Sequence, residues 1–483
     1  MNLSPILPSQ TIINELSEWA MMHGVAIKNS DGTARHCPFS LAPIAIKREV
    51  YNRLITITPL IARLVSNIAE DHTFISDALS KMAKAEPFFN RLFDLHQQIH
   101  FGVDTTAKRE PLLIMRTDYM DDRILGPKVI EFNGIAAGMG PFGQRAHEFH
   151  RYVQQQWPAE YGMWAENPNA ELADNQGLEE LAQGIATTAR HMRQAAGEDG
   201  KPLFVMVVQE NEDNIYDQHL LEVALQQRGI KTVRRTFVQL ASQLSTGKND
   251  RLALEGLGNV DVIYLRAGYQ YQDYCHESII ESECCYTLSQ TRAFIERHHV
   301  AVNATVSQQL ATSKTMQMLI TNMPATELVK WGLTLDEAEQ VKLVLAPMLP
   351  ITVDTQDWLK NDTDNEEWVL KNQGEGGGHC VFGRDIATTL ASLTPDEYDA
   401  WALMQRLHPH TREKFALGVR ETKAEQIDDL ISEIGLFTIH FRGQPVTSQL
   451  GYAGYLVRSK PATENEGGIH SGRGILDSLA LIA

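Results

Sequence analysis

Residues 369–383, VLKNQGEGGGHCVFG, place a lysine, a carboxylate and three successive glycines within one short segment. Glycines carry no Cβ, so a phosphate chain can lie against the backbone N–H groups of residues 376–378, and Lys371 supplies a positive charge beside them. Glu375 would repel the phosphates unless Mg²⁺ lay between them, since Mg²⁺ commonly binds one or two carboxylates together with phosphate oxygens. The segment therefore predicts a nucleotide and magnesium site, with a flexible surface hairpin as the alternative.

A second segment, KVIEFN at residues 128–133, offers ligands for the same kind of ion. Glu131 and Asn133 are two residues apart in an expected strand, so both side chains point to the same side of it. There they would present a carboxylate and an amide oxygen, which suit a hard cation. The alternative is that Glu131 is a strand-end residue in contact with solvent.

The chain continues into a GxGxxG pattern from Gly138 to Gly143, followed by the helical sequence QRAHEFHRYV. This pattern occurs in dinucleotide-binding folds, so an NAD-dependent dehydrogenase is an alternative function from a different class. The fit is poor, because the glycines should follow the apolar strand directly, whereas polar residues and a further loop intervene. Neither the Walker nor the protein kinase motifs occur, since Ser242 stands where a Walker sequence ending at Gly247-Lys248 needs its first glycine.

Two further segments suggest a zwitterionic small molecule. QENEDNIYDQ follows an apolar run and carries Glu212, Asn214 and Gln218, which could hold an ammonium and a carboxylate group. YLRAGY places Arg266 and Tyr269 at the end of another expected strand, and arginine binds carboxylates in a bidentate manner. The alternative for the first segment is a cluster of surface residues that caps a helix.

Near the C-terminus, YLVRSK places Arg458 and Lys460 on one face of an expected strand, before a glycine-rich loop at 467–474. Such a cation pair could bind anions beneath a closing loop. The alternative is a basic edge strand that discourages aggregation.

Two pairs of histidines have spacings that occur in metal sites. They are His147 with His150 and His408 with His410. No third ligand is visible beside either pair, so we expect all four to be solvated surface residues.

The elements that position these residues can be read from hydrophobic periodicity. Residues 12–100 are mostly helical in pattern, while PLLIMRTDYM and KVIEFN are typical of buried strands. From 203 to 302 the order strand, helix, strand, strand indicates a parallel α/β subdomain. We therefore expect three parts: a helical region with the first part of the core at 1–202, a substrate-binding subdomain at 203–302, and the rest of the core with a lid at 303–483.

The composition is that of a globular chain of 483 residues, with 43% hydrophobic and 22% charged residues. A net charge of −18 argues against binding to nucleic acid or an acidic membrane. The five cysteines form no CxxC pair, which favours a reducing compartment. No secretion signal and no apolar stretch long enough to span a membrane is visible, so we expect a cytoplasmic protein.

Together the segments RTDYM, EFN, NIYDQ with RRTF, LRAGY, LKNQGEGGG, SEIGLF and VRSK resemble the eukaryotic-type glutathione synthetase family of ATP-grasp ligases. The resemblance runs from the N-terminal helices to ILDSLALI. It implies a mixed α/β fold in which an ATP-grasp core with a glycine-rich lid carries an inserted Rossmann-like subdomain, usually as a homodimer. It also implies ATP-dependent ligation of γ-glutamylcysteine and glycine to glutathione through an acyl phosphate, with release of ADP and phosphate. A related ligase using another acceptor amino acid, as in homoglutathione synthesis, is the alternative.

The resemblance also assigns residues to each ligand. Two Mg²⁺ ions per site would be held by Glu131, Asn133 and Glu375. ATP would contact Glu131, Lys314, Lys371, Asn372, Gln373, Gly374, Glu375, Gly376, Gly377, Gly378, Phe382, Met404, Gln405, Arg406, Leu407, Glu433, Lys460 and Glu466. The dipeptide and its acceptor would contact Arg116, Ile135, Ala136, Ala137, Gly138, Glu212, Asp213, Asn214, Gln218, Arg266, Ala267, Gly268, Tyr269, Arg458, Ile469 and His470. The implied catalytic residues are Arg116, Lys314, Lys371, Glu375 and Arg458.

The chain departs from the family pattern at several of these positions. Ala136 and Gly138 stand where serines are expected, Gln405 and Arg406 change the adenine hinge, Glu466 replaces an aspartate, and Phe382 replaces a tyrosine. In the lid, Ile469, His470 and Ser471 replace Val-Ala-Ala. Because that loop adjoins the acceptor in the family, the choice of acceptor is the property that these departures affect most.

Overall fold

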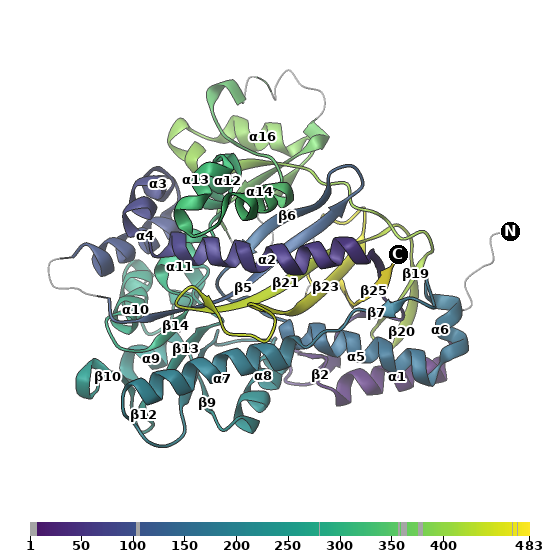
Figure 1. Ribbon diagram of the computed structural model, residues 1–483, viewed down its shortest axis with the longest axis horizontal. Coiled ribbons are helices and arrows are strands. Elements are labelled where there is room, and N and C mark those ends of the chain that lie inside the picture. Colours follow the sequence, from purple (N-terminus) through teal and green to yellow (C-terminus); the bar gives the residue numbers. More distant parts are fainter. Residues whose placement is uncertain are drawn as a thin grey trace.

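The computed structural model describes residues 7–102, 107–279, 281–355, 358, 365–374, 380–465, 467–470 and 472–483 (Figure 1). Its centre is a 13-stranded sheet in which strands far apart in the sequence lie side by side. In spatial order these are β20 (Lys423–Ile427), β19 (Ala416–Arg420), β3 (Phe39–Ser40), β24 (Ile475–Asp477), β23 (Tyr452–Pro461), β21 (Leu430–Phe441), β5 (Glu110–Asp122), β14 (Ala301–Asn303), β13 (Val262–Leu265), β8 (Leu203–Val207) and β9 (Lys231–Arg235), while β6 (Gly126–Asn133) also pairs with β5 and β22 (Gln444–Pro445) with β21.

Helices cover both faces of the central sheet. α2 (Arg48–Ala69) crosses one face, and α5 (Gly140–Gln156) and α7 (Gly177–Ala195) lie on the other (Figure 1). Along β5, Leu113 and Met115 belong to the core beneath α2, whereas Leu112 and Ile114 belong to the core beneath α5 and α7. A strand that is buried on both faces produces this alternation.

The N-terminal region is less helical than the sequence indicates. It forms α1 (Gln10–Met22), α2, α3 (His72–Ala85) and α4 (Pro87–His100), but also β1 (Ala26–Lys28), β2 (Ala34–His36), β3 and β4 (Ile44–Lys47). β1 and β2 pair across a turn in which Gly32 has a φ of 85° and Asp31 accepts a hydrogen bond from the Thr33 amide. The helical prediction is wrong between α1 and α2, because these turn residues reverse the chain.

The parallel unit has the elements that the sequence predicts between 203 and 302. β14, β13, β8 and β9 run parallel in that order, with α8 (Ile215–Gln227), α9 (Phe237–Gln243) and α10 (Glu281–Glu296) between them in the chain. Its four strands form one end of the central sheet, where Ala301 and Val302 of β14 pair with Glu110 and Pro111 of β5. Loops that leave these strands therefore face the rest of the core.

A second sheet of four antiparallel strands forms the upper lobe of Figure 1. Its order is β15 (Met348–Pro350), β18 (Trp401–Gln405), β16 (Trp368–Asn372) and β17 (Cys380–Phe382), and α16 (Asp385–Ser392) covers one face through Leu370 and Leu403. Lys371 and Met404 point to the opposite face, because each is adjacent to one of those leucines. Beside this sheet lie α12 (Lys314–Asn322), α13 (Ala325–Leu328) and α14 (Leu335–Val344).

The remaining elements are short. They are α6 (Pro158–Trp164), α11 (Val306–Ala311), β7 (Glu171–Leu172), β10 (Leu244–Thr246), β11 (Leu252–Leu254), β12 (Gly258–Asn259), β25 (Leu479–Ile482) and the 3₁₀ turns Lys248–Asp250, Tyr271–Tyr274, Val329–Trp331, Asn365–Glu367 and Pro395–Ala400. Within the described ranges, no helix combines the length and apolarity that a membrane span requires.

The GxGxxG segment serves packing rather than a dinucleotide loop. α5 begins at Gly140, and a Cβ on Gly143 would lie 1.9 Å from the backbone oxygen of Tyr455 in β23. Gly143 therefore lets the helix approach the sheet closely. This packing role removes the reason for a dehydrogenase reading.

The structure excludes the alternative of a basic edge strand and corrects the expected position of two histidines. β23 is no edge strand, since it pairs with β21 on one side and β24 on the other. His147 and His150 are buried, with exposed fractions of 6% and 1%, and His150 is bonded to Ser478 Oγ and to the Ser40 carbonyl. Their expected surface position is wrong because α5 packs between the sheet and its neighbours; His410 is exposed and His408 partly so, as expected.

Candidate active site

A cavity of about 730 Å³ lies where the four-stranded sheet, the central sheet and the parallel unit meet. Strands β6, β16, β18, β21 and β23 contribute side chains to it, as do the first residue of α12 and the loops after β8 and β13. Polar residues at the ends of several strands are thereby brought together, which is the usual position of ligand sites in α/β proteins.

The middle of the cavity combines a carboxylate with several cations. Lys314 Nζ lies 3.4 Å from Glu131 Oε2, and Lys371 Nζ donates to the Ile130 carbonyl at 2.7 Å. Both lysines are nearly buried, with exposed fractions of 5% and 8%. Burial raises the pKa of Glu131, but the charges of Lys314, Lys371 and two arginines outweigh it and hold the pKa at about 2.

This depressed pKa predicts how the contribution of Glu131 depends on pH. A carboxyl group whose folded pKa lies below its ordinary value of 4.5 stabilises the fold above that value, and loses the contribution as the pH falls through about 2. We therefore expect the free energies of unfolding of the wild type and of Glu131→Gln, measured in urea, to differ by a constant amount from neutral pH down to about pH 4.5. Below that pH the difference should shrink. A difference that vanished above pH 4.5 would contradict the proposed contacts of Glu131 with the two lysines.

Asp118 of β5 organises the cations from behind the cavity wall. Its carboxylate accepts two hydrogen bonds from Arg116, at 2.6 and 2.8 Å, and one from Arg458 Nη2 at 3.0 Å. Asn133 Nδ2 also donates to it, at 3.1 Å. The exposed fraction of Asp118 is 1%, so these contacts occur in a region of weak solvent screening.

We expect Asp118→Asn to be strongly destabilising. The substitution removes the counter-charge from the buried guanidinium group of Arg116 and from the partly buried one of Arg458, and breaking a buried pair typically costs about 3–5 kcal/mol. The exposed pair of Arg48 with Glu171 provides the matched control, since Glu171→Gln should cost less than about 1 kcal/mol. Chemical denaturation measures both; equal small effects would show that Asp118 has no such role.

One end of the cavity is apolar. Met404 and Leu407 form a small cluster with Met348 and Ala402, and Met120 and Ile130 pack against it. The amides of Gln405 and Arg406 already donate to the carbonyls of Pro347 and Glu367. A planar ring bound at this end would therefore form backbone hydrogen bonds with carbonyl groups or with the backbone of Leu407, and not with the amides of Gln405 and Arg406.

The opposite end is polar and is formed by the parallel unit. Arg266 Nη1 donates to Asp217 Oδ2 at 2.9 Å, and the same oxygen accepts from the Met139 amide. A Cβ on Gly138 would lie 2.2 Å from Arg266 Nη2, so only glycine fits beside this guanidinium. Asn214 Oδ1 is buried without a hydrogen-bond partner in the structure, which leaves an acceptor for a ligand.

The lid segment reaches this polar end. Ile469 is buried with an exposed fraction of 1%, and His470 Nδ1 lies 3.2 Å from Asp213 Oδ2. Hydrogen bonding to His470 lowers the pKa of Asp213. Lys460 Nζ donates to the Asn465 carbonyl at 2.7 Å and so joins β23 to the same segment.

Most of the assigned residues meet in the cavity. Those that line it are Arg116, Glu131, Asn133, Ile135, Ala136, Gly138, Glu212, Asp213, Asn214, Arg266, Tyr269, Lys314, Lys371, Asn372, Gly374, Phe382, Met404, Gln405, Arg406, Leu407, Glu433, Arg458, Lys460, Ile469 and His470.

Others lie elsewhere. Ala137, Gln218, Ala267, Gly268 and Gln373 are not among the lining residues. Gln373 is fully buried and donates to Thr315 Oγ1 and the Ala400 carbonyl, so it holds the start of α12 against β16.

Glu375, Gly376, Gly377, Gly378 and Glu466, together with Ser471, lie outside the described residues. The roles that the resemblance assigns to them remain predictions.

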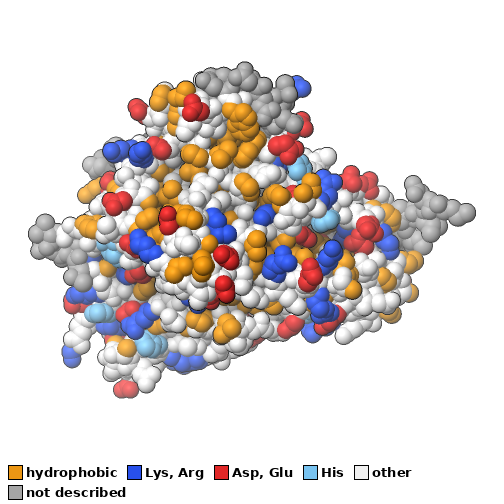
Figure 2. Space-filling view, turned by 45° about the horizontal axis from the view of Figure 1, so that its top comes forward, with side chains coloured by type: hydrophobic (Ala, Val, Ile, Leu, Met, Phe, Trp, Pro, Cys, Tyr) orange, Lys and Arg blue, Asp and Glu red, His pale blue; other side chains and the backbone are white. Residues whose placement is uncertain are grey.

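The cavity is locally positive in an acidic protein. The described residues that line it include eight basic residues (Lys and Arg) and five acidic ones (Asp and Glu). In the whole chain the balance is reversed, with 43 basic and 61 acidic residues. Figure 2 shows basic and acidic side chains interspersed over the face that it draws, with no basic patch of the kind that binds nucleic acid. The excess of cations therefore favours a small anionic ligand.

Comparisons with known proteins agree along the whole chain. It is 27% identical to a chloroplastic glutathione synthetase of Solanum lycopersicum, over 98% of this chain and 84% of that protein, and 26% identical to the glutathione synthetase of Homo sapiens, over 98% and 96%. Among solved structures, a glutathione synthetase-like effector of Globodera pallida superposes with a TM-score of 0.72 at 17% identity, covering 99% of both chains.

The sequence model of the eukaryotic glutathione synthase ATP-binding domain matches residues 8–481. The structure confirms the predicted mixed α/β class, and the match confirms the ATP-binding domain of this family. The chain belongs to the eukaryotic glutathione synthase family.

Proposed function

We propose that the protein is an ATP-dependent ligase that joins γ-glutamylcysteine to glycine, releasing glutathione, ADP and phosphate. The observation that supports this best is the order of environments along one cavity. An apolar end suits a purine ring, a cationic middle suits a triphosphate, and a polar end with Arg266 and Asn214 suits a zwitterionic peptide. Family membership supplies the reaction type that this order fits.

Mg²⁺ would be held by Glu131 and Asn133, with Glu375 as a further predicted ligand. The donor set fits, because oxygen ligands suit this ion and the two described side chains lie two residues apart on one side of β6. Asn133 Nδ2 is fixed by Asp118, which orients the amide oxygen away from that bond. When bound, the ion would neutralise phosphate charge.

The first chemical step would be attack of the cysteinyl carboxylate oxygen on the γ-phosphorus, with ADP as the leaving group. Lys314 and Lys371 would hold the phosphoryl oxygens and stabilise the charge that they carry in the transition state. Both ammonium groups are nearly buried, so their electrostatic effect is larger than it would be in water.

In the second step the glycine amine would attack the acyl carbon, phosphate would leave, and the amine would lose a proton. Arg458 would bind the acceptor carboxylate and so orient the amine. Its guanidinium is fixed by Asp118 and by Glu433, 3.3 Å away. The lid would exclude water, which otherwise hydrolyses the acyl phosphate.

We further propose that the protein acts in the cytoplasm as a homodimer with two Mg²⁺ ions per site, and that residues 203–302 form its substrate-binding subdomain. The family resemblance implies the homodimer, the ions and the inserted subdomain, and the spacing of the cysteines favours the cytoplasm. The parallel α/β unit at one end of the cavity supports the assignment of residues 203–302.

Phosphate release tests the proposal directly. Release should require ATP, γ-glutamylcysteine and an amino acid together, and glycine should give the highest rate in a panel with alanine, β-alanine and serine. A preference for β-alanine or serine would assign the chain to the homoglutathione type and would point to Ile469 and His470. Absence of release with every acceptor would contradict the proposed reaction.

A further inference from the structure

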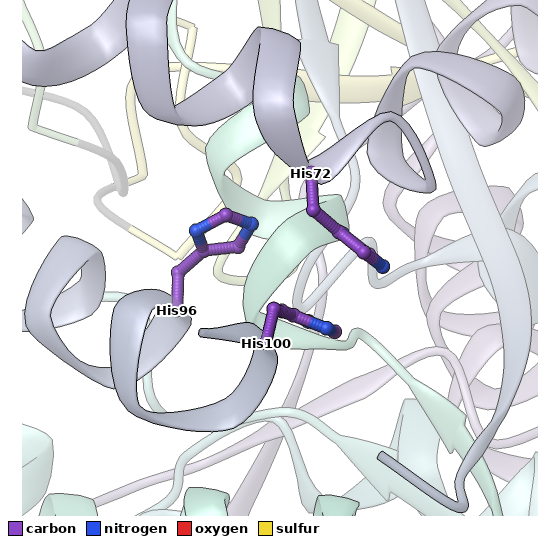
Figure 3. A group of neighbouring side chains, drawn as sticks. All are labelled: His72, His96 and His100. Atoms are coloured by element: carbon purple, nitrogen blue, oxygen red, sulfur yellow. The ribbon is translucent and has the colours of Figure 1, made fainter. Parts of the chain in front are cut away.

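A three-histidine cluster, formed by His72, His96 and His100, lies outside the active-site cavity (Figure 3). Each ring offers a nitrogen atom, and these three atoms lie within 4.8 Å of one another. His72 is the first residue of α3, while His96 and His100 are one turn apart on α4. Histidines four residues apart on a helix share one face, the spacing by which helices commonly chelate zinc.

The hydrogen bonding of the cluster is incomplete. His96 has an exposed fraction of 0%, and neither of its ring nitrogens has a hydrogen-bond partner in the structure. The Nδ1 atom of His72 is also buried and has no hydrogen-bond partner among the described residues. Most buried polar atoms in native proteins are bonded, so a histidine with two unpartnered nitrogens among other histidines calls for a ligand.

The rings are chemically ready for a metal ion. Burial lowers the pKa of His96 to about 3 and that of His100 to about 2, so both are neutral near pH 7 and each carries a lone pair. His100 Nε2 lies 3.1 Å from Ser307 Oγ. If Nδ1 of His100 is the ligating atom, this contact is the outer hydrogen bond that orients most metal-binding histidines.

The charges around the cluster allow a cation. Arg109 is the nearby positive group, but Glu70 bonds it at 2.9 and 3.0 Å and Glu296 lies 3.4 Å from it. Glu70 Oε2 is also 4.0 Å from His72 Nε2. The carboxylates of Glu70 and Glu296 offset the charge of the Arg109 guanidinium. The Glu70 carboxylate is the one beside the histidines.

We propose that His72, His96 and His100 bind one transition-metal ion of the zinc class, which fastens the start of α3 to the end of α4. Imidazole nitrogens suit Zn²⁺ and its neighbours, whereas Mg²⁺ requires oxygen ligands, so the site is chemically distinct from the catalytic one. Binding requires the His72 and His100 rings, which stack at 3.5 Å, to turn until all three nitrogens lie about 2.0–2.1 Å from the ion.

The test is a competition titration of the purified full chain with Zn²⁺ against a chromophoric chelator, with excess Mg²⁺ and no dipeptide present. We expect one tightly bound Zn²⁺ per chain and a higher melting temperature, because a ligand of the native state stabilises it. His72→Gln and His100→Gln should each weaken binding about 100-fold, since loss of even an outer partner commonly costs roughly 10- to 100-fold.

His219→Gln is the matched control, because that side chain is 65% exposed and lies outside the cluster. It should bind zinc as the wild type does. Equal binding by all these proteins would mean adventitious zinc on other groups, and no stoichiometric binding by the wild type would equally overturn the proposal. His96→Gln is a third variant of the series. Because His96 is fully buried, this variant could fail to fold, whereas His72 and His100 are partly exposed and their variants still test the proposal. Phosphate release from the same preparations reports the catalytic site separately.

Discussion

Glu131→Gln should lower turnover by about 10²- to 10³-fold while the protein remains folded. The amide keeps the shape of the side chain but removes the negative charge that faces Lys314 and, in the proposed complex, the metal-bound phosphates. Losing one preorganised electrostatic contact to a transition state commonly costs this much. Initial rates of phosphate release at saturating substrates measure the effect, and their dependence on Mg²⁺ should shift to higher concentration.

The control for this variant is Glu171→Gln on the surface, which should leave turnover unchanged because Glu171 forms an exposed ion pair with Arg48. Circular dichroism should show both variants folded. Unaltered turnover and Mg²⁺ dependence in Glu131→Gln would remove this carboxylate from the catalytic site.

Arg458→Ala should chiefly weaken the use of glycine. Truncating a guanidinium that binds a carboxylate with little solvent nearby costs about 2–5 kcal/mol, so the KM for glycine should rise by about 30-fold or more. The KM for ATP should change less, because Arg458 does not belong to the apolar cluster around Met404 and Leu407 that is proposed to hold the purine ring. Steady-state kinetics with each substrate varied in turn separate the two effects.

Arg458→Lys keeps the positive charge beside Asp118 but loses the bidentate geometry. It should therefore retain the stability of the wild type and show an intermediate KM for glycine. If the alanine variant changed the KM for ATP alone, Arg458 would belong to the nucleotide end and the acceptor assignment would be wrong.

The local chemistry of the cavity was predictable from sequence wherever one strand carried it. Residue spacing alone places Glu131 and Asn133 on one side of β6, and both line the cavity. Lys371 faces it for the same reason, because Leu370 next to it packs beneath α16. Periodicity likewise predicted β5, β6 and the parallel unit.

Contacts between distant segments were not predictable in this way. Asp118 is a polar residue within RTDYM whose sequence neighbours give no sign of its partners. The pairing of β5 with β6 places it beside Asn133, and the pairing of β5 with β21 and of β21 with β23 places it beside Arg458. Gln373 belongs to the loop motif, yet its side chain is buried against α12. His150 belongs to an amphipathic helix, and its burial follows from packing on both sides of α5 rather than from its neighbours in sequence.

The three-histidine cluster could be predicted from the sequence in part. HQQIH at residues 96–100 is an i, i+4 pair within a stretch that was expected to be helical, and this spacing was available as a signal. The third member, His72, comes from another helix, so its proximity required the fold.

A crystal structure with Mg²⁺ and a nonhydrolysable ATP analogue tests the central claim most directly. We predict that the purine ring lies against Met404 and Leu407, that the triphosphate contacts Lys314 and Lys371, and that a magnesium ion joins it to Glu131. A triphosphate bound away from Lys371, or magnesium held without Glu131, would contradict the proposed site.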